Sequence, residues 1–125
     1  MDNNYIKIKD FENIYLEDSW IVDIIVKPSK IEIYLEIVLT TGHINYKAPS
    51  KTDQYCYQKG IIMFDEIKEI YWDQSNIQKS TDSLNNIDYG NIDTFYIQND
   101  FNFYLEGGLG VLKIKCENYP KIIWM

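Results

Sequence analysis

The chain of 125 residues contains no arginine, and all twelve of its basic residues are lysines. Nineteen acidic residues give it a formal net charge of −7. Nucleic-acid binding normally requires a basic face, and arginine is the preferred reader of phosphates and guanine edges. The charge balance therefore argues against a nucleic-acid partner, and it suits either an ordinary solvated surface or a basic protein partner.

Alanine and long apolar runs are also lacking. Alanine occurs once, at Ala48, whereas helix-rich chains use this strong helix former freely. The eleven tyrosines and the many isoleucines fit a pleated sheet instead. Apolar runs such as Ile24-Ile25-Val26 are too short to cross a bilayer, and residues 1–18 lack the apolar core of a secretory signal. We therefore expect a cytoplasmic protein with no membrane partner.

Potential metal ligands are scarce, since Cys56, Cys116 and His43 are the only cysteines and the only histidine. A zinc site needs about four ligands, commonly in close pairs, and this spacing is absent. The sequence thus predicts no metal and no other cofactor. Reduced thiols are expected in a cytoplasmic protein. A Cys56–Cys116 disulfide stays open as an alternative because spacing alone does not define its geometry.

The clearest secondary-structure pattern is a hairpin around the turn Pro28-Ser29-Lys30. Apolar side chains alternate with polar ones on both sides of this turn, as in strands with one buried face. The expected inward-facing residues are Trp20, Val22, Ile24 and Val26 before the turn, and Ile31, Ile33, Leu35, Ile37 and Leu39 after it.

Shorter strands are predicted along the rest of the chain, and two polar segments, 41–53 and 73–91, are predicted as long loops. A helix fits the apolar positions of residues 60–72 as well, but we favour two strand pieces broken near Asp65-Glu66. About eight or nine strands of this kind predict a single all-β domain over residues 1–125, either an antiparallel barrel or a two-sheet sandwich. The further strands are expected at 5–9, 54–58, 94–98, 101–105 (with Phe101, Phe103 and Leu105 facing inward), 112–116 and 121–125.

No catalytic set emerges from these residues. A thiol nucleophile needs a base within hydrogen-bond reach, and nothing in the spacing brings His43 to Cys56. In a strand over 54–58, Tyr55 and Tyr57 share one face and Cys56 occupies the other, so either the tyrosines or the thiol faces the core. The glycine cluster at 107–110 precedes an expected strand rather than a helix, so it is interpreted as a hairpin turn and not as a phosphate loop.

Acidic and basic residues are segregated along the chain. Residues 10–26 and 80–112 each contain five acids and no lysine. An acidic rim around aromatic anchors suits the capture of a basic protein, whereas an ordinary solvated surface is the plainer interpretation. The candidate partner-binding residues are Glu17, Asp18, Trp20, Asp82, Asp88, Tyr89, Asp93 and Asp100.

Four stretches, YLEDSWIV at 15–22, VLT at 38–40 with His43 and Tyr46, QYCY at 54–57 and DYGNID at 88–93, resemble a family of small bacterial proteins for which no activity is known. The resemblance covers most of the chain and implies a single domain of the bacterial cytosol. It implies no catalytic residue, cofactor or ligand.

Three functional hypotheses follow. The leading one is a non-enzymatic binding protein, in its most specific form an immunity-type protein that neutralises a basic toxin domain. The second is a β-barrel that holds a small apolar ligand. The third is a hydrolase that uses His43 with a nearby acid or Cys56. An exposed strand edge also leaves open a homodimer.

Overall fold

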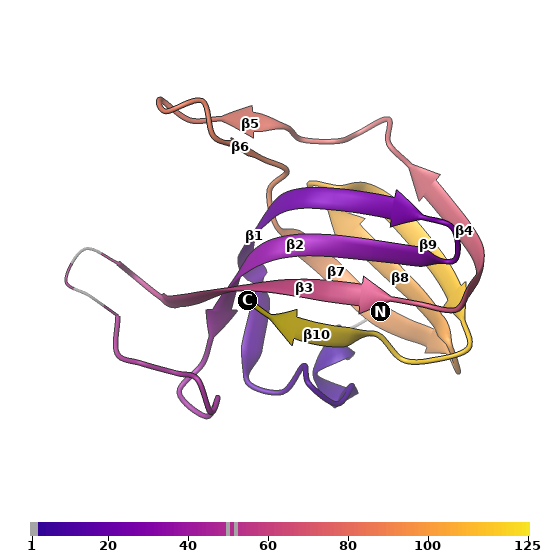
Figure 1. Cartoon of the computed structure of the whole chain (residues 1–125), viewed down its shortest axis with the longest axis horizontal. Coiled ribbons are helices and arrows are strands. Elements are labelled where there is room, and N and C mark those ends of the chain that lie inside the picture. Colours follow the sequence, from indigo (N-terminus) through magenta and orange to yellow (C-terminus); the bar gives the residue numbers. More distant parts are fainter. Residues whose placement is uncertain (1–2, 50, 52) are drawn as a thin grey trace.

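Two four-stranded antiparallel sheets face each other in the computed structural model, which describes residues 3–49, 51 and 53–125 (Figure 1). A separate two-stranded hairpin projects from one end of this pair (Figure 1). The predicted all-β class and the two-sheet sandwich are confirmed, with ten strands in the described residues instead of eight or nine. The sheets do not close into a barrel.

The first sheet has the strand order β1-β2-β3-β10, so the last strand of the chain lies beside the third. The predicted turn at Pro28-Ser29 is confirmed, because Lys27 pairs with Lys30 across it. Its strands are β1 (Ile14–Lys27), β2 (Lys30–Leu39), β3 (Cys56–Phe64) and β10 (Lys121–Trp124).

The second sheet has the order β4-β9-β8-β7 and packs behind the first (Figure 1). The chain enters it at the predicted break, where Glu66 lies between β3 and β4 with a positive φ of 50°. The strands are β4 (Ile67–Asp73), β7 (Ile92–Asn99), β8 (Asn102–Gly107) and β9 (Gly110–Cys116).

Side chains from both sheets fill the space between them. Alternation along β2 predicts its buried face correctly, since Ile31, Ile33 and Ile37 are 0 % exposed. Phe95 lies at the centre of the aromatic contacts, with its ring centroid 5.7 Å from that of Phe11. The interior that a ligand-holding barrel would require is thus occupied by the protein's own side chains; the largest of these that are fully buried are Phe11, Phe64, Phe95 and Phe103.

The predicted strand at 5–9 is wrong, because Tyr5–Lys7 forms a 3-10 helix, η1. The buried side chains here are those of Tyr5, Ile8 and Phe11, at a spacing of three residues. Three residues per turn is the period of a 3-10 helix, whereas a strand has a period of two. The exposed side chain of Ile6, which alternation alone would leave unexplained, fits this spacing.

The predicted inward face of β1 is wrong for Trp20 and Val22. Trp20 and Val22 are 44 % and 42 % exposed, whereas Ile21 between them is completely buried. The pairing with β2 shifts register between Tyr15 and Trp20 and again between Ile21 and Asp23. Each irregularity reverses the face to which the following side chains point. After the second shift Ile24 and Val26 pair with the buried Ile33 and Ile31, so they return to the inward face. There Ile24 packs against the core, whereas Val26, one residue from the end of this edge strand, remains exposed.

Two smaller differences concern turns and loops. Phe101, predicted to face inward, lies in the β7–β8 turn with 37 % of its surface exposed, and its ring packs against Tyr119. The predicted loop over 73–91 contains the projecting hairpin, formed by β5 (Ser80–Thr81) and β6 (Ile87–Asp88). Its two-residue strands are too short for a periodic signal, although Asp82 and Asn85 are typical turn residues.

Candidate functional site

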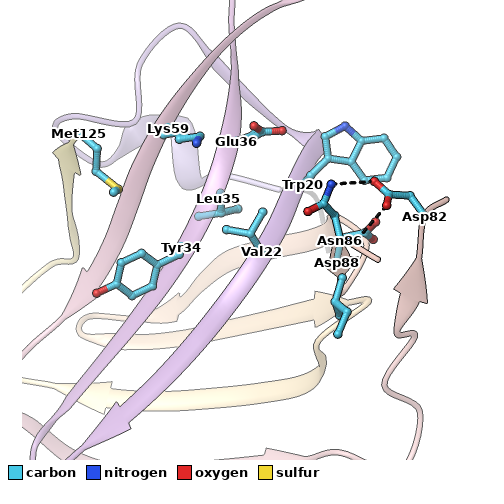
Figure 2. Close-up of a pocket in the computed structure, with 11 residues that line it drawn as sticks. Trp20, Val22, Tyr34, Leu35, Glu36, Lys59, Asp82, Asn86, Asp88 and Met125 are labelled. Atoms are coloured by element: carbon cyan, nitrogen blue, oxygen red, sulfur yellow. Dashed lines mark hydrogen bonds between the residues drawn. The ribbon is translucent and has the colours of Figure 1, made fainter. Parts of the chain in front are cut away.

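A groove of about 540 Å³ separates the β5–β6 hairpin from the outer face of the first sheet (Figure 2). We call it the hairpin groove. One wall comes from β1, β2 and β3, the other from the hairpin, and Met125 follows the end of β10. The groove is lined by Trp20, Val22, Tyr34, Leu35, Glu36, Lys59, Asp82, Asn86, Ile87, Asp88 and Met125.

The floor of the hairpin groove is apolar because of the irregular pairing of β1. The register shifts turn Trp20 and Val22 away from the core and onto the outer face. On the opposite wall Ile87 is 42 % exposed, and Met125 at the end of the first sheet is 67 % exposed. Exposed apolar side chains gathered in one groove mark an interaction surface more often than scattered ones do.

Three carboxylates and one ammonium group line the groove, namely those of Glu36, Asp82, Asp88 and Lys59. The lining therefore carries a formal charge of −2, from three negative groups and one positive group. Figure 2 shows Asp82 and Asp88 on the hairpin side, with Trp20 facing Asp82 and Asn86. An acidic wall beside an indole ring combines the two groups that attract a lysine or arginine side chain, a carboxylate and an aromatic face.

The carboxylate of Asp82 also builds the turn that carries it. Its Oδ1 accepts hydrogen bonds from the backbone N–H of Leu84 at 2.8 Å and of Asn86 at 2.9 Å. Its Oδ2 accepts one from the side-chain amide of Asn86 (Figure 2). The bond from the Asn86 backbone is the main cause that lowers the pKa of Asp82. Asp82 is therefore negatively charged at neutral pH and held in place at the same time.

The base of the hairpin is tied to β1. The N–H of Tyr89 donates to the carbonyl oxygen of Ile21, and the N–H of Ile21 donates to that of Gly90, both at 2.8 Å. The side-chain amide of Asn91 donates to the carbonyl oxygen of Glu17. Asp88 supports this corner, since its Oδ1 accepts from the N–H of Gly90 at 3.0 Å. These bonds fix the base of the hairpin against β1, while the tip of the hairpin projects into solvent (Figure 1).

Three of the eight candidate partner-binding residues, Trp20, Asp82 and Asp88, come together in this groove. Glu17 and Asp18 instead accept hydrogen bonds from tyrosines. Tyr5 donates to Glu17, and burial followed by this bond raises the pKa of Tyr5. The hydroxyl of Tyr55 donates to Asp18 at 2.9 Å, which raises the pKa of Tyr55.

The other three candidates lie elsewhere. Tyr89 is half-buried against the core and lines a small crevice of about 120 Å³ between β1 and β4. Asp93 is exposed on β7, and Asp100 is exposed in the β7–β8 turn with a φ of 42°. Neither lines the hairpin groove. The acid-rich segments therefore do not form one continuous site in the fold.

Glu36, Lys59 and Met125 line the groove but were not among the sequence candidates. Alternation does place Glu36 on the outer face of β2, opposite the buried isoleucines. Its proximity to Lys59 and Trp20 follows from the pairing of Glu36 with both residues across neighbouring strands. Met125 joins them only because β10 pairs with β3, and no signal in the sequence gives this strand order.

The histidine and the cysteines occupy separate places. The Nδ1 of His43 accepts from the backbone N–H of Asn45 at 3.0 Å, its ring packs against Trp124, and burial lowers its pKa. Cys56 is half-buried in a different depression, where its Sγ accepts from the N–H of Lys47. Both cysteines are free thiols, so the Cys56–Cys116 disulfide is not formed. Among the described residues, no group of three or more potential ligands is arranged to hold a metal ion.

Comparison with known proteins gives no match to a family model, to a curated protein or to a solved structure. No helix in the described part of the chain is long and apolar enough to cross a membrane.

Proposed function

We propose that the chain is a non-enzymatic binding protein that captures a basic segment of a partner protein in the hairpin groove. The observation that carries the proposal is the position of Trp20, which is turned outward by the β1 irregularity and faces the acids of the hairpin. An exposed tryptophan in a groove is a typical energetic anchor of a protein interface. The surrounding carboxylates select a cationic partner and increase its rate of association.

The segment that best fits this groove carries a lysine or arginine next to an apolar side chain. The cation would lie between the indole of Trp20 and the carboxylates of Asp82 and Asp88. The apolar neighbour would cover Val22 and Met125, which are exposed in the free protein. A cation over an aromatic face contributes about 0.5–2 kcal/mol, depending on how far it is desolvated.

In its most specific form the proposal is a cytoplasmic, immunity-type protein that neutralises a basic toxin domain. The acidity of the chain and the shape of the groove support this version. It is tested by co-expression with the basic proteins encoded beside its gene. Wild-type protein is expected to relieve the growth arrest that such a protein causes, whereas a variant with a neutralised groove is not.

The general proposal is tested with a phage-displayed library of random linear peptides selected on the immobilised protein. Peptides with Lys or Arg beside an apolar residue are expected to be enriched, and their affinity should fall with salt because exposed charges are screened. The triple variant Glu36→Gln, Asp82→Asn and Asp88→Asn should lose this enrichment. It removes three charges while an amide oxygen remains to accept the turn hydrogen bonds.

The matched control is Glu12→Gln with Asp93→Asn and Asp100→Asn. It removes the same three charges from positions outside the hairpin groove. Equal loss of binding in both triple variants would show that net charge alone, and not the groove, determines binding. Unchanged binding in the groove variant would contradict the proposal. Trp20→Ala is expected to weaken a selected peptide by about 2 kcal/mol, the lower bound for an interface anchor.

A further inference from the structure

The four edge strands of the two sheets differ in how their outer backbone groups are satisfied. Proteins generally protect such edges, because unpaired N–H and C=O groups recruit further strands. On β7 the side chain of Asn3 accepts from the N–H of Phe95 at 2.9 Å, and that of Asn4 accepts from the N–H of Ile97 at 2.7 Å. The N-terminal asparagines thus cap the edge of β7.

The edges of the first sheet are also protected. On β1 the backbone of Ile21 is bonded to Tyr89 and Gly90, and the N–H of Ile24 donates to the carboxylate of Asp23 at 2.8 Å. At the other side of that sheet, β10 has four residues, and its Ile122 is 7 % exposed. The ring of His43 packs against Trp124 at the end of this strand.

The direction of the amides on β4 follows from the caps on β7. Since Phe95 and Ile97 direct their N–H groups outward, Tyr96 bonds inward to Tyr104 on β8. Alternation across β8 and β9 then bonds Lys113 to Tyr71 on β4. The two-residue turn between β8 and β9 gives the same alternation, because its closing pair, Gly107 and Gly110, is a hydrogen-bonded pair.

The N–H groups of Ile70 and Trp72 consequently point away from the sheet. Among the described residues, no hydrogen bond outside the β4–β9 ladder reaches either amide. The side chains of Ile70 and Tyr71 are 40 % and 57 % exposed, although Ile70 is on the inward face of its strand. β4 therefore presents an edge without the side-chain caps of β7 and β1.

We propose that β4 pairs antiparallel with β4 of a second copy of this chain, around a two-fold axis through Ile70. In that register the two Ile70 side chains meet, and Glu69 of each copy lies opposite Tyr71 of the other. Such an isologous contact needs a self-complementary strand, and this one is self-complementary. Tyrosine-to-carboxylate hydrogen bonds already occur within the chain, for example from Tyr104 to Glu106 at 2.6 Å.

A second copy suits this edge better than a basic partner does. The charged residues of β4 and of the adjacent β9 are Lys68, Glu69, Asp73, Lys113 and Lys115, so this edge lacks the negative excess of the hairpin groove. None of the residues that line the groove is on β4, and the dimer and the proposed function can therefore fail independently. The contact involves one short strand from each copy, so we expect a weak dimer, populated towards roughly 1 mM protein, because small interfaces are typical of transient complexes.

Sedimentation velocity of the full chain at rising concentration tests the proposal. The mass is expected to rise from the 14.9 kDa of one chain towards twice that value. Ile70→Lys should keep the protein monomeric, whereas Ile123→Lys on β10 should not. The two isoleucines form a matched pair, since each is 40 % exposed on an edge strand. A monomer throughout the concentration range, or a dimer abolished by Ile123→Lys and retained by Ile70→Lys, would overturn the proposal.

Amide hydrogen exchange in the wild-type protein gives a readout that does not depend on the folding of a variant. The amides of Ile70 and Trp72 should become protected as concentration rises. Those of Tyr71 and Lys113 should be protected at every concentration, because the β4–β9 ladder already holds them. Dimerisation without concentration-dependent protection of Ile70 and Trp72 would show that another surface mediates it, and the proposal would be abandoned.

Discussion

The backbone N–H of Tyr89 donates to the carbonyl oxygen of Ile21 at 2.8 Å, across 68 positions of the sequence. This bond holds the root of the β5–β6 hairpin against β1 at the point where β1 turns Trp20 outward. The position of the hairpin and the exposure of the tryptophan therefore have a common origin, the irregular stretch of β1. The hairpin groove exists because both occur at the same place.

Replacement of Ile21 is expected to be far more damaging than replacement of Trp20. Ile21→Ala should lower the free energy of unfolding by about 2–5 kcal/mol, because it opens a cavity in a completely buried position. Trp20→Ala should cost less than about 1 kcal/mol, as expected for a surface position. Urea denaturation of the two variants checks this, and the reverse order would mean that β1 has the regular face predicted from alternation.

The turn of the hairpin is expected to depend on the side-chain oxygens of Asp82 as hydrogen-bond acceptors. Because its pKa is lowered in the folded chain, the stabilisation is present above the unfolded value of about 3.8 and is lost as the pH falls through the lower folded value. Asp82→Ala should raise amide exchange over residues 80–88 at neutral pH while leaving the sheets protected. Asp82→Asn, which keeps an acceptor oxygen, is the control, and equal exchange in both variants would contradict this role.

Gly108 is expected to tolerate no side chain. A Cβ at this position would lie 1.8 Å from the carbonyl oxygen of Tyr89, and backbone cannot rotate away as a side chain can. Gly108→Ala should cost about 3 kcal/mol or more. At Gly42 the added carbon would meet only the side chain of Asn13, so Gly42→Ala should be much milder. Thermal unfolding of the pair checks the contrast, and similar melting temperatures would contradict it.

The two thiols are expected to react differently. Cys116 is 5 % exposed, and burial, followed by the nearby charge of Asp65, raises its pKa to about 12. Cys56 is only half-buried, so a thiol reagent at pH 8 should modify it first and reach Cys116 on unfolding. Equal rates for both in the native protein would contradict the burial of Cys116.

The raised pKa of Cys116 also predicts a loss of stability in alkali. The folded protein holds the neutral thiol, so its contribution is fully present below the unfolded value of about 9 and is lost as the pH rises towards 12. Cys116→Ser should flatten the fall in unfolding free energy between these pH values. An unchanged pH profile in this variant would exclude Cys116 as a source of the alkaline loss.

The sequence predicts those parts of the fold in which one strand pairs regularly. The five inward positions of β2 and the break at Asp65-Glu66 are examples, because alternation and turn chemistry are local properties. The outward turn of Trp20 is not predictable, since the bulges of β1 depend on its pairing with β2. The sequence does not predict the 3-10 helix at Tyr5, because two buried residues, Tyr5 and Ile8, are too few to distinguish a period of three from a period of two.

For the candidate site, the absence of lysine around Trp20, Asp82 and Asp88 was the useful signal. This signal does not distinguish Asp82 and Asp88 from Asp93 and Asp100, which lie outside the groove. All four acids belong to one lysine-free segment, and the fold distributes that segment over several strands. Glu36 and Lys59 contribute through strand order, which is a property of the whole sheet. The contribution of Met125 depends on the return of β10 to β3 at the end of the chain.

The asparagine caps on β7 have a consequence for how the chain is made. The bond from Phe95 to Asn3 joins residues 92 positions apart, so Asn3 is synthesised 92 residues before the strand position that it caps. Until β7 is synthesised, Asn3 and Asn4 have no strand edge to cap. The edge of the newly made β7 then stays open until these two residues dock on it. Contacts this distant in sequence form slowly. The interval between the synthesis of β7 and the docking of Asn3 and Asn4 is therefore the stage at which the nascent protein is most vulnerable to pairing with the wrong strand.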